Sequence, residues 1–290
     1  MTILVVGATG RLGGEIARRL LAAGDEPVRI LVRPGAQYDE LAALGALPVT
    51  GDLKDRGSLD AAVRDVATIV TTANSAQRGG ADSAEAVDQQ GNRNLIDAAR
   101  AGGVGHFVFI SALGADEKSA VGLMRGKGMT ERALRESGMG YTILAPNVFM
   151  DVWVPLVVGG PTLAGGQVTI VGEGRRRHAF VAMADVAAIA AATVGNAAAR
   201  DAYIPIGGPD AVSWRDVIAT FERVIGRQIA VNSVAPGAPL PGYPEVIGGL
   251  LTAMDTYDSP LDMTETARTF GVRLTSLEEY TRHAFGGAGA

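Results

Sequence analysis

The stretch that decides the fold is Met1–Gly13, with the sequence MTILVVGATGRLG. Thr2–Val6 is a short run of apolar, largely β-branched residues, as expected for a buried strand of a parallel sheet. Three glycines follow at three-residue spacing, and Glu15–Ala23 then has the apolar period of an amphipathic helix. A strand, a glycine turn and a helix in this order place backbone N–H groups and a helix N-terminus against a pyrophosphate. The opening of the chain therefore predicts a dinucleotide-binding βα unit.

Each of the three glycines has its own predicted role. Gly7 permits the sharp turn after the strand, Gly10 lets a phosphate approach the backbone, and Gly13 lets the helix pack close to the strand. A tight βα turn that binds no ligand is the alternative for a glycine triplet. The strand directly before the triplet and the helix directly after it favour the dinucleotide interpretation.

Composition narrows the class of protein. The chain has 290 residues, of which 47% are apolar and 20% charged, so it is long enough for one large α/β domain, alone or with a smaller appendage. The net charge of −5 argues against a nucleic-acid surface. We expect no signal peptide and no membrane span, because the chain opens on a core strand and has no uninterrupted apolar run of about eighteen residues. Cysteine is absent and the three histidines are far apart, so we expect a cytoplasmic protein without a metal site.

The end of the second predicted strand, Pro27–Val32, indicates which dinucleotide binds. NAD-binding folds place a carboxylate about twenty residues beyond the glycines, to accept the ribose hydroxyls. This chain has Arg33 there, and no carboxylate stands between Val28 and Tyr38. A guanidinium pairs with a 2′-phosphate, and Arg11 in the glycine turn offers a second one, although either arginine is also compatible with a solvated surface charge. The sequence favours NADP(H) over NAD(H).

Other predicted strands deliver side chains to the same edge of the sheet. Leu47–Thr50 ends just before Asp52, which can hydrogen-bond the adenine, and Leu53, which can pack on its face; Asp52 at the start of an ordinary turn is the alternative. Thr68–Ala73 leads to residues that we expect beside the cofactor, with a structural role equally compatible: Thr72, Ala73 and Asn74.

Strands and helices alternate over the first 150 residues, which predicts an α/β fold, a doubly wound parallel (Rossmann) sheet. The last two of its six strands are His106–Ser111 and Tyr141–Ala145, and His106 at the start of its strand is expected to be structural. We expect a dinucleotide-binding domain over 1–150. Residues 151–290 then form a small C-terminal α+β substrate domain that partly completes the sheet.

Several local features are also expected. Ser58 caps a helix over Leu59–Val66, and Ser83–Ala101 forms one long helix. Gln167–Val171 and His178–Val181 form short strands that bracket a run of three arginines. Three irregular segments complete the pattern, namely a loop over the cofactor edge, a proline-rich linker and a frayed tail: Gln77–Ala81, Gly237–Pro244 and Gly286–Ala290.

Taken together, these motifs resemble the NmrA-like family of atypical short-chain dehydrogenase/reductases. The resemblance covers most of the chain in order and is strongest over the first 150 residues. The matching stretches are Val6–Gly14, Leu31–Arg33, Gly51–Leu53, Phe107–Ser111, Lys127, Tyr141–Met150 and Asp185–Ala187. The resemblance implies an NAD(P)-binding Rossmann domain with a small C-terminal substrate domain. Family members include quinone reductases, triphenylmethane-dye reductases, isoflavone-reductase-like enzymes, and redox sensors that bind the cofactor without turnover.

One departure from the wider family matters. That family uses Tyr-x-x-x-Lys, in which the lysine lowers the pKa of a tyrosine that acts as general acid or base. Lys127 corresponds to the lysine, but Leu123 stands where the tyrosine would be, and neither Lys54 nor Lys118 follows a tyrosine at this spacing. The departure disfavours alcohol oxidation, sugar epimerisation and dehydration. It allows hydride delivery to an acceptor that takes its proton from water.

The remaining site residues rest mainly on the resemblance. Lys127 would hold the nicotinamide ribose hydroxyls or stabilise negative charge on a reduced substrate oxygen, and Ser111 would hydrogen-bond the substrate or the nicotinamide. The predicted cofactor-binding residues are Gly7, Thr9, Gly10, Arg11, Leu12, Gly13, Arg33, Asp52, Leu53, Thr72, Ala73, Asn74, Lys127, Pro146 and Asn147. An apolar wall for an aromatic acceptor is predicted at Phe149, Met150 and Trp153, for which the domain core is the alternative. His178 and Tyr243 are weaker candidates for a proton donor.

We therefore expect an NADPH-dependent reductase that passes hydride to a small, aromatic or quinonoid acceptor. The alternative is a non-catalytic sensor that binds NADP(H) and a protein partner. A homo-oligomer is compatible with the sequence, but nothing in it points to one.

Overall fold

The structure is a computed structural model that describes residues 1–76, 78–240 and 242–286. Residues 77, 241 and 287–290, which belong to the loop, the linker and the tail expected above, lie outside the described residues. The described chain divides into two compact units. Unit 1 comprises Met1–Pro146, Val186–Pro205 and Arg268–Val272, and unit 2 comprises Asn147–Asp185, Ile206–Ala267 and the C-terminal residues from Arg273.

Unit 1 is built on a seven-stranded sheet with the order β3-β2-β1-β4-β5-β6-β8. The strands are β1 (Thr2–Val6), β2 (Val28–Val32), β3 (Leu47–Thr50), β4 (Val66–Thr71), β5 (His106–Ile110), β6 (Gly140–Pro146) and β8 (Ala202–Ile206). The pairings among the first six strands are all parallel. This confirms the predicted doubly wound sheet, and the strand order reverses between β1 and β4, where such sheets bind ligands.

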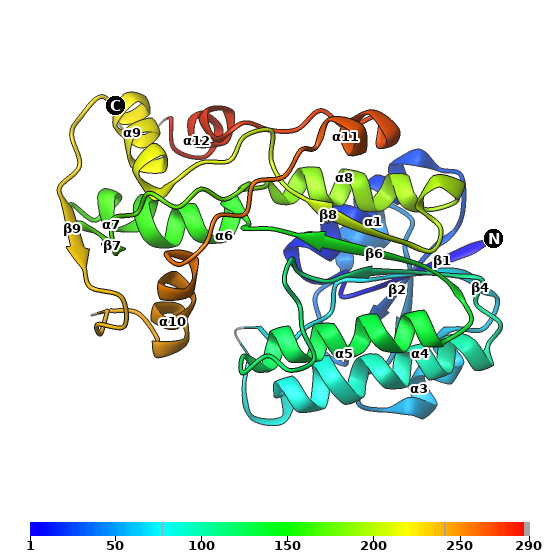
Figure 1. Cartoon of the computed structure of the whole chain (residues 1–290). Coiled ribbons are helices and arrows are strands. Elements are labelled where there is room, and N and C mark those ends of the chain that lie inside the picture. Colours follow the sequence, from blue (N-terminus) through cyan, green and yellow to red (C-terminus); the bar gives the residue numbers. More distant parts are fainter. Residues whose placement is uncertain (77, 241, 287–290) are drawn as a thin grey trace. The chain divides into compact units, whose positions relative to one another are not determined.

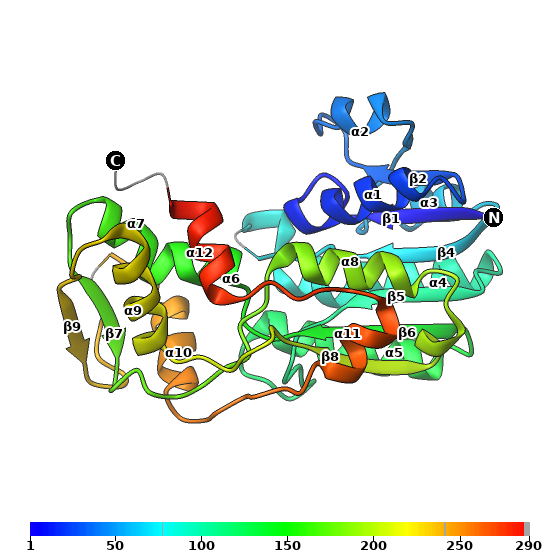
Figure 2. The same ribbon diagram turned by 90° about the horizontal axis from the view of Figure 1, so that it is seen from above.

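Helices cover both faces of this sheet, as Figures 1 and 2 show. One face carries α3 (Arg56–Ala62), α4 (Asn92–Ala101) and α5 (Gly122–Glu136). The other carries α1 (Arg11–Ala23) and α8 (Met183–Thr193), and the short α2 (Asp39–Ala43) precedes β3. His106 is buried at the start of β5, and its Nε2 lies 2.8 Å from Thr142 Oγ1, a structural contact of the kind expected for it.

Two expectations about the helices of unit 1 were wrong. Asp55 rather than Ser58 caps α3, accepting a hydrogen bond from the Gly57 amide, while the Ser58 hydroxyl donates to the Asp55 carbonyl at 2.7 Å. The long helix expected over Ser83–Ala101 begins instead with a π-helical segment, η2 (Glu85–Gly91), before α4. This segment packs closely against α5 at Gly126, where an added Cβ would lie 2.6 Å from Asp88 Cβ and 3.1 Å from the Asp88 carbonyl carbon.

Unit 2 has a smaller core between helices and a two-stranded parallel sheet, β7 (Val168–Val171) and β9 (Val231–Val234). Its helical segments are α6 (Met150–Val154), η3 (Pro155–Gly159), α7 (Gly160–Leu163), α9 (Trp214–Ile225), α10 (Glu245–Met254), α12 (Leu277–Phe285) and the start of α11 (Thr264–Phe270). The strand expected over His178–Val181 is absent from the described structure, because those residues make only isolated bridges. Edge-to-face packing of Phe180 on Trp214, with ring centroids 5.2 Å apart, lies in this core.

None of the helices in the described residues is long and apolar enough to cross a bilayer.

The close approach of α1 to the turn after β1 yields a stability prediction. Gly13→Ala places a Cβ that overlaps the Gly7 carbonyl and lies 2.8 Å from Thr72 Oγ1. We expect it to lower the free energy of unfolding by about 1–3 kcal/mol, the usual cost of overpacking. Gly249→Ala in α10 is the matched control, because a Cβ there meets nothing within 4 Å. The control should be neutral or stabilising by up to about 1 kcal/mol, and equal urea midpoints for both variants would contradict the packing argument.

Candidate functional site

The N-terminus of α1 forms a cradle for an anion. Gly7 has φ of +89°, and its carbonyl accepts a hydrogen bond from the Gly10 amide at 3.0 Å, which closes the turn. Gly10 occupies the N-cap position with no side-chain cap, and the first turn of α1 contains no acidic residue. The first amides of a helix carry partial positive charge and have no partner within the helix. A pyrophosphate fits this cradle, because neither a side-chain cap nor a carboxylate competes for it.

The end of β4 packs directly against the same turn. A Cβ on Gly7 would lie 2.6 Å from Thr72 Oγ1 and 3.1 Å from the Ala73 nitrogen. The structure thus brings Thr72 and Ala73 beside the glycine turn, and their contact with a cofactor stays a prediction. Asn74 stabilises its own loop: its amide donates to the Thr72 carbonyl at 3.1 Å and its side-chain oxygen accepts from the Ala76 nitrogen at 2.9 Å.

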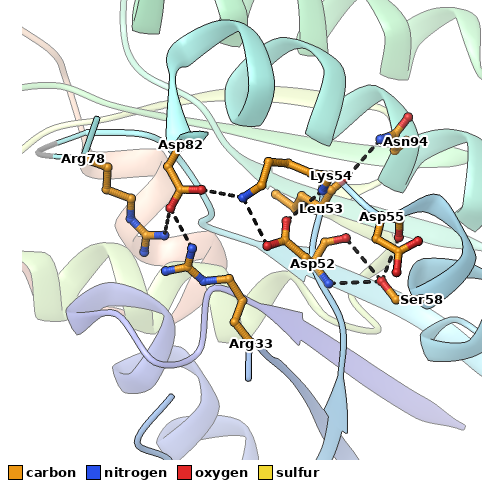
Figure 3. A network of polar contacts seen from close by, with 9 residues as sticks. All are labelled: Arg33, Asp52, Leu53, Lys54, Asp55, Ser58, Arg78, Asp82 and Asn94. Carbon is orange, nitrogen blue, oxygen red and sulfur yellow. Dashed lines mark hydrogen bonds and ion pairs between the residues drawn. The ribbon is translucent and has the colours of Figure 1, made fainter. Parts of the chain in front are cut away.

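A cluster of charged side chains lies beyond the ends of β2 and β3 (Figure 3). Arg33 donates to the Asp82 carboxylate at 2.7 Å, and Lys54 bridges Asp82 and Asp52, with 3.1 Å between Lys54 Nζ and Asp52 Oδ2. Arg78 approaches Asp82 at 3.4 Å. Lys54 and then Arg33 hold the pKa of Asp82 well below its usual range, and Asp82 in turn raises the pKa of Lys54. We call these five residues the Asp82 cluster.

The two residues predicted to contact adenine also have partners in the protein. Asp52 Oδ1 accepts from the Lys54 amide at 2.8 Å, and the Asp52 amide donates to Ser58 Oγ at 3.1 Å. Leu53 is only 5% exposed and belongs to the hydrophobic core of unit 1. Roles for Asp52 and Leu53 toward a cofactor therefore stay predictions.

Lys127 on α5 is a buried cation at the carboxyl end of β5. Its ammonium donates to the Ile110 carbonyl at 2.7 Å and lies 5.2 Å from the centroid of the Phe109 ring. Burial lowers the pKa of Lys127 to about 8, and the charges of Asp88 and Glu131 oppose that shift. Lys127 is therefore an ammonium at neutral pH in a place where few waters screen its charge.

The groups around Lys127 are held in turn by hydrogen bonds. Ser111 Oγ donates to Glu131 Oε1 at 2.6 Å, and Glu131 also pairs with Arg135 at 3.2 Å. Asp88 is buried in η2 and accepts hydrogen bonds from the amide and hydroxyl of Ser75; burial raises the pKa of Asp88. Since the Ser111 proton is committed to Glu131, its oxygen is left as an acceptor for an N–H or O–H group.

Several members of the Asp82 cluster and several groups around Lys127 were not among the residues predicted from the sequence. Glu131 stands four residues after Lys127 on the same helix, a spacing that signals a contact. Asp82 ends the short 3₁₀ helix η1 (Gly80–Asp82), Asp88 lies in η2, and no local spacing relates either residue to Arg33 or Lys127. Lys54 stands two residues after Asp52, so the sequence already indicated that it lies at the same edge of the sheet.

The predicted residues after β6 differ in their surroundings. The Pro146 carbonyl ends β6 and accepts from the Leu113 amide at 2.9 Å. In unit 2 the Asn147 amide donates to the Ser259 carbonyl at 2.9 Å. Met150 is 1% exposed within the core of that unit, whereas Phe149 and Trp153 are half-buried. Of these three side chains, Phe149 and Trp153 present surface for an acceptor, whereas Met150 belongs to the core.

The two weaker candidates for a proton donor have structural partners. His178 is buried, with Nδ1 2.7 Å from Ser259 Oγ and Nε2 3.0 Å from the Met254 carbonyl. Burial lowers the pKa of His178. The Tyr243 hydroxyl donates to the Leu156 carbonyl at 3.1 Å.

Sequence comparisons relate this chain to NAD(P)H-binding proteins. The sequence profile of the NAD(P)H-binding family matches residues 7–197. An NAD(P)H azoreductase from Xenophilus azovorans is 32% identical over 234 residues, covering 78% of this chain and 75% of the relative. A photosystem II assembly factor from Cyanophora paradoxa is 33% identical, covering 81% and 72%.

Quinone oxidoreductase 2 of Escherichia coli aligns over almost the whole chain. It is 26% identical, covering 98% of each sequence. Its crystal structure in complex with NADPH superposes with a TM-score of 0.79, covering 98% of this chain and 100% of that one at 24% identity, which supports the fold.

The buried ammonium yields a prediction about pH. Lys127 has a pKa of about 8 in the folded chain against an ordinary value of 10.5. Between these pH values the unfolded chain binds more protons than the folded chain, so the free energy of unfolding rises with pH. Across this pH range the free energy of unfolding should rise by on the order of 3 kcal/mol. Lys127→Met removes this contribution, so wild type should gain stability relative to the variant between pH 8 and 10 in urea titrations. A difference that stays flat or falls would contradict the assignment.

Proposed function

We propose that this chain, which belongs to the NAD(P)H-binding family of NmrA-like, atypical short-chain dehydrogenase/reductases, is an NADPH-dependent reductase of small aromatic or quinonoid acceptors. The observation that carries the proposal is the uncapped, carboxylate-free N-terminus of α1 beside the end of β4. That position is the switch point of the sheet, where dinucleotides bind in folds of this kind.

Residues of unit 1 bind the cofactor in this proposal. The amides at Arg11–Gly13 hold the pyrophosphate, and Arg33 pairs with the 2′-phosphate that distinguishes NADPH from NADH. Thr72 and Ala73 line the approach from β4. When bound, the reduced nicotinamide supplies a hydride.

Lys127 and Ser111 then act on the reacting end. The Lys127 ammonium, held by the Ile110 carbonyl, stabilises negative charge that develops on the acceptor. Ser111 Oγ, whose proton goes to Glu131, accepts a hydrogen bond and so orients the nicotinamide amide or the acceptor. Because Leu123 replaces the usual tyrosine, the proton that completes reduction comes from water.

The acceptor class rests on relatives and on two side chains. Two relatives bear the names azoreductase and quinone oxidoreductase, and both names denote conjugated acceptors. Phe149 and Trp153 are half-buried aromatic side chains that can pack against a flat ring. We therefore propose quinones and azo or cationic dyes as the first acceptors to test.

A second candidate function is a sensor that binds NADP(H) without turnover. Leu123 favours it, because a site without the tyrosine lacks the usual proton donor. The relative named as a photosystem II assembly factor shows that the family includes proteins named for assembly rather than for reduction. Tight NADPH binding together with no NADPH oxidation across a broad acceptor panel would favour the sensor.

Turnover provides the test of the reductase. Wild type should oxidise NADPH in the presence of at least one quinone or dye, as followed at the absorbance of NADPH. Lys127→Met should lower kcat about a hundredfold because the field at the developing charge is lost. Lys118→Met removes an exposed lysine and is the control. Equal kcat in wild type and Lys127→Met would show that Lys127 has no role in the reaction.

Cofactor preference is tested at Arg33. Arg33→Asp replaces a cation beside the 2′-phosphate with a repelling carboxylate, so NADPH affinity should fall by about tenfold or more while NADH affinity stays within about twofold. Arg93→Asp, on an exposed face of α4, carries the same charge change and should alter neither. Fluorescence titration measures both affinities, and an unchanged NADPH-to-NADH ratio in Arg33→Asp would contradict the proposed contact.

A further inference from the structure

Three cations from separate segments converge on one carboxylate at the edge of the unit 1 sheet. Arg33 follows β2, Lys54 follows β3, and Arg78 and Asp82 lie beyond β4. All three cations contact Asp82, as Figure 3 shows. Asp82 is 17% exposed, whereas the cations are 46%, 32% and 43% exposed in the order Arg33, Lys54 and Arg78. The carboxylate is thus the inner member of the cluster and the cations surround it.

The charges of this cluster do not balance. It contains three cations and only two carboxylates, Asp52 and Asp82, and so carries a net charge of about +1. A phosphate monoester carries −1.5 to −2 at neutral pH. Adding that group beside both carboxylates would leave an excess of negative charge. When Asp82 leaves the cluster, the three cations and Asp52 carry a net charge of about +2, which balances the charge of the phosphate.

We propose that Lys54 and Arg33 together bind the 2′-phosphate of NADPH, and that the Asp82 carboxylate holds the position of that phosphate until NADPH displaces it. This inference rests on the proposed cofactor function and extends it to Lys54 and Asp82. Each exposed ion pair of Asp82 is weak on its own. A phosphate offers more acceptor oxygens to the same donors, so exchange favours the phosphate.

Asp82 then acts differently on the two dinucleotides. NADH has a hydroxyl at the 2′ position and brings no charge to displace Asp82. The carboxylate can stay with its cations and accept a hydrogen bond from that hydroxyl, as acidic residues do in NAD-binding folds. Asp82 is therefore a specificity-determining residue that weakens NADPH binding and leaves NADH binding unpenalised, while Lys54 strengthens NADPH binding alone.

The test compares affinities of the full-length chain for NADPH, NADH and adenosine 2′,5′-bisphosphate by calorimetry. Lys54→Met should weaken NADPH and the bisphosphate about tenfold and change NADH less than about twofold. Lys54→Arg should restore most of the NADPH affinity. Asp82→Asn should tighten NADPH and the bisphosphate by about threefold to tenfold, with NADH unchanged or slightly weaker, and the gain should shrink at about 0.5 M salt.

Matched controls come from the pair Arg56–Asp60 on α3, which is exposed and outside the cluster. Arg56→Met and Asp60→Asn repeat the two charge changes and should leave all three affinities unchanged. If Asp82→Asn weakens NADPH, or if Lys54→Met weakens NADPH and NADH alike, the inference is overturned while dinucleotide binding stands. If wild type binds neither dinucleotide, both the inference and the proposed function fail.

Discussion

The contact on which the candidate site depends is the approach of α1 to the turn that follows β1. Gly13 lies so close to the Gly7 carbonyl that no side chain fits between them. This approach brings the N-terminus of α1 to the carboxyl edge of the sheet, next to the end of β4. A longer separation would admit side chains and would move the helix amides away from the switch point. The anion cradle is therefore a consequence of backbone packing, and its main requirement is the absence of side chains.

The same sheet edge contains two charged clusters with different physical character. The Asp82 cluster lies near the surface, so its ion pairs can exchange partners readily and are weakened by salt. The cluster around Lys127 is buried, and its charges are stabilised by hydrogen bonds: the Lys127 ammonium donates to the Ile110 carbonyl, and the hydroxyls of Ser75 and Ser111 donate to Asp88 and Glu131. Exchangeable pairs suit the recognition of a charged cofactor group. A buried ammonium whose position is held suits the stabilisation of charge during a reaction.

The fold was predictable from the sequence because its signals are local. The strand, glycine and helix pattern of the first 23 residues and the later alternation of strands and helices were sufficient for the parallel sheet. Errors came where two nearby side chains compete or where helical geometry changes: Asp55 takes the cap expected of Ser58, and a π-helical segment interrupts the helix after Ser83. The strand expected over His178–Val181 does not form in the described residues of unit 2, because His178 makes isolated bridges to Val212 and Ser259 and no continuous strand pairing.

The site was less predictable than the fold. No carboxylate stands near Arg33 in the sequence, between Val28 and Tyr38, yet Asp82, 49 residues further along, contacts it in the structure. Such a contact depends on the path of the chain between β4 and η2, and no periodicity encodes that path. The environment of Lys127 has the same origin, since Asp88 reaches it only through the packing of η2 on α5.

A crystal structure of the chain grown with NADPH tests the central claim most directly. The account predicts the pyrophosphate against the amides of Arg11–Gly13, with the adenosine end directed to Arg33. A pyrophosphate bound elsewhere, with the cradle at the start of α1 empty or filled by a protein side chain, would contradict it.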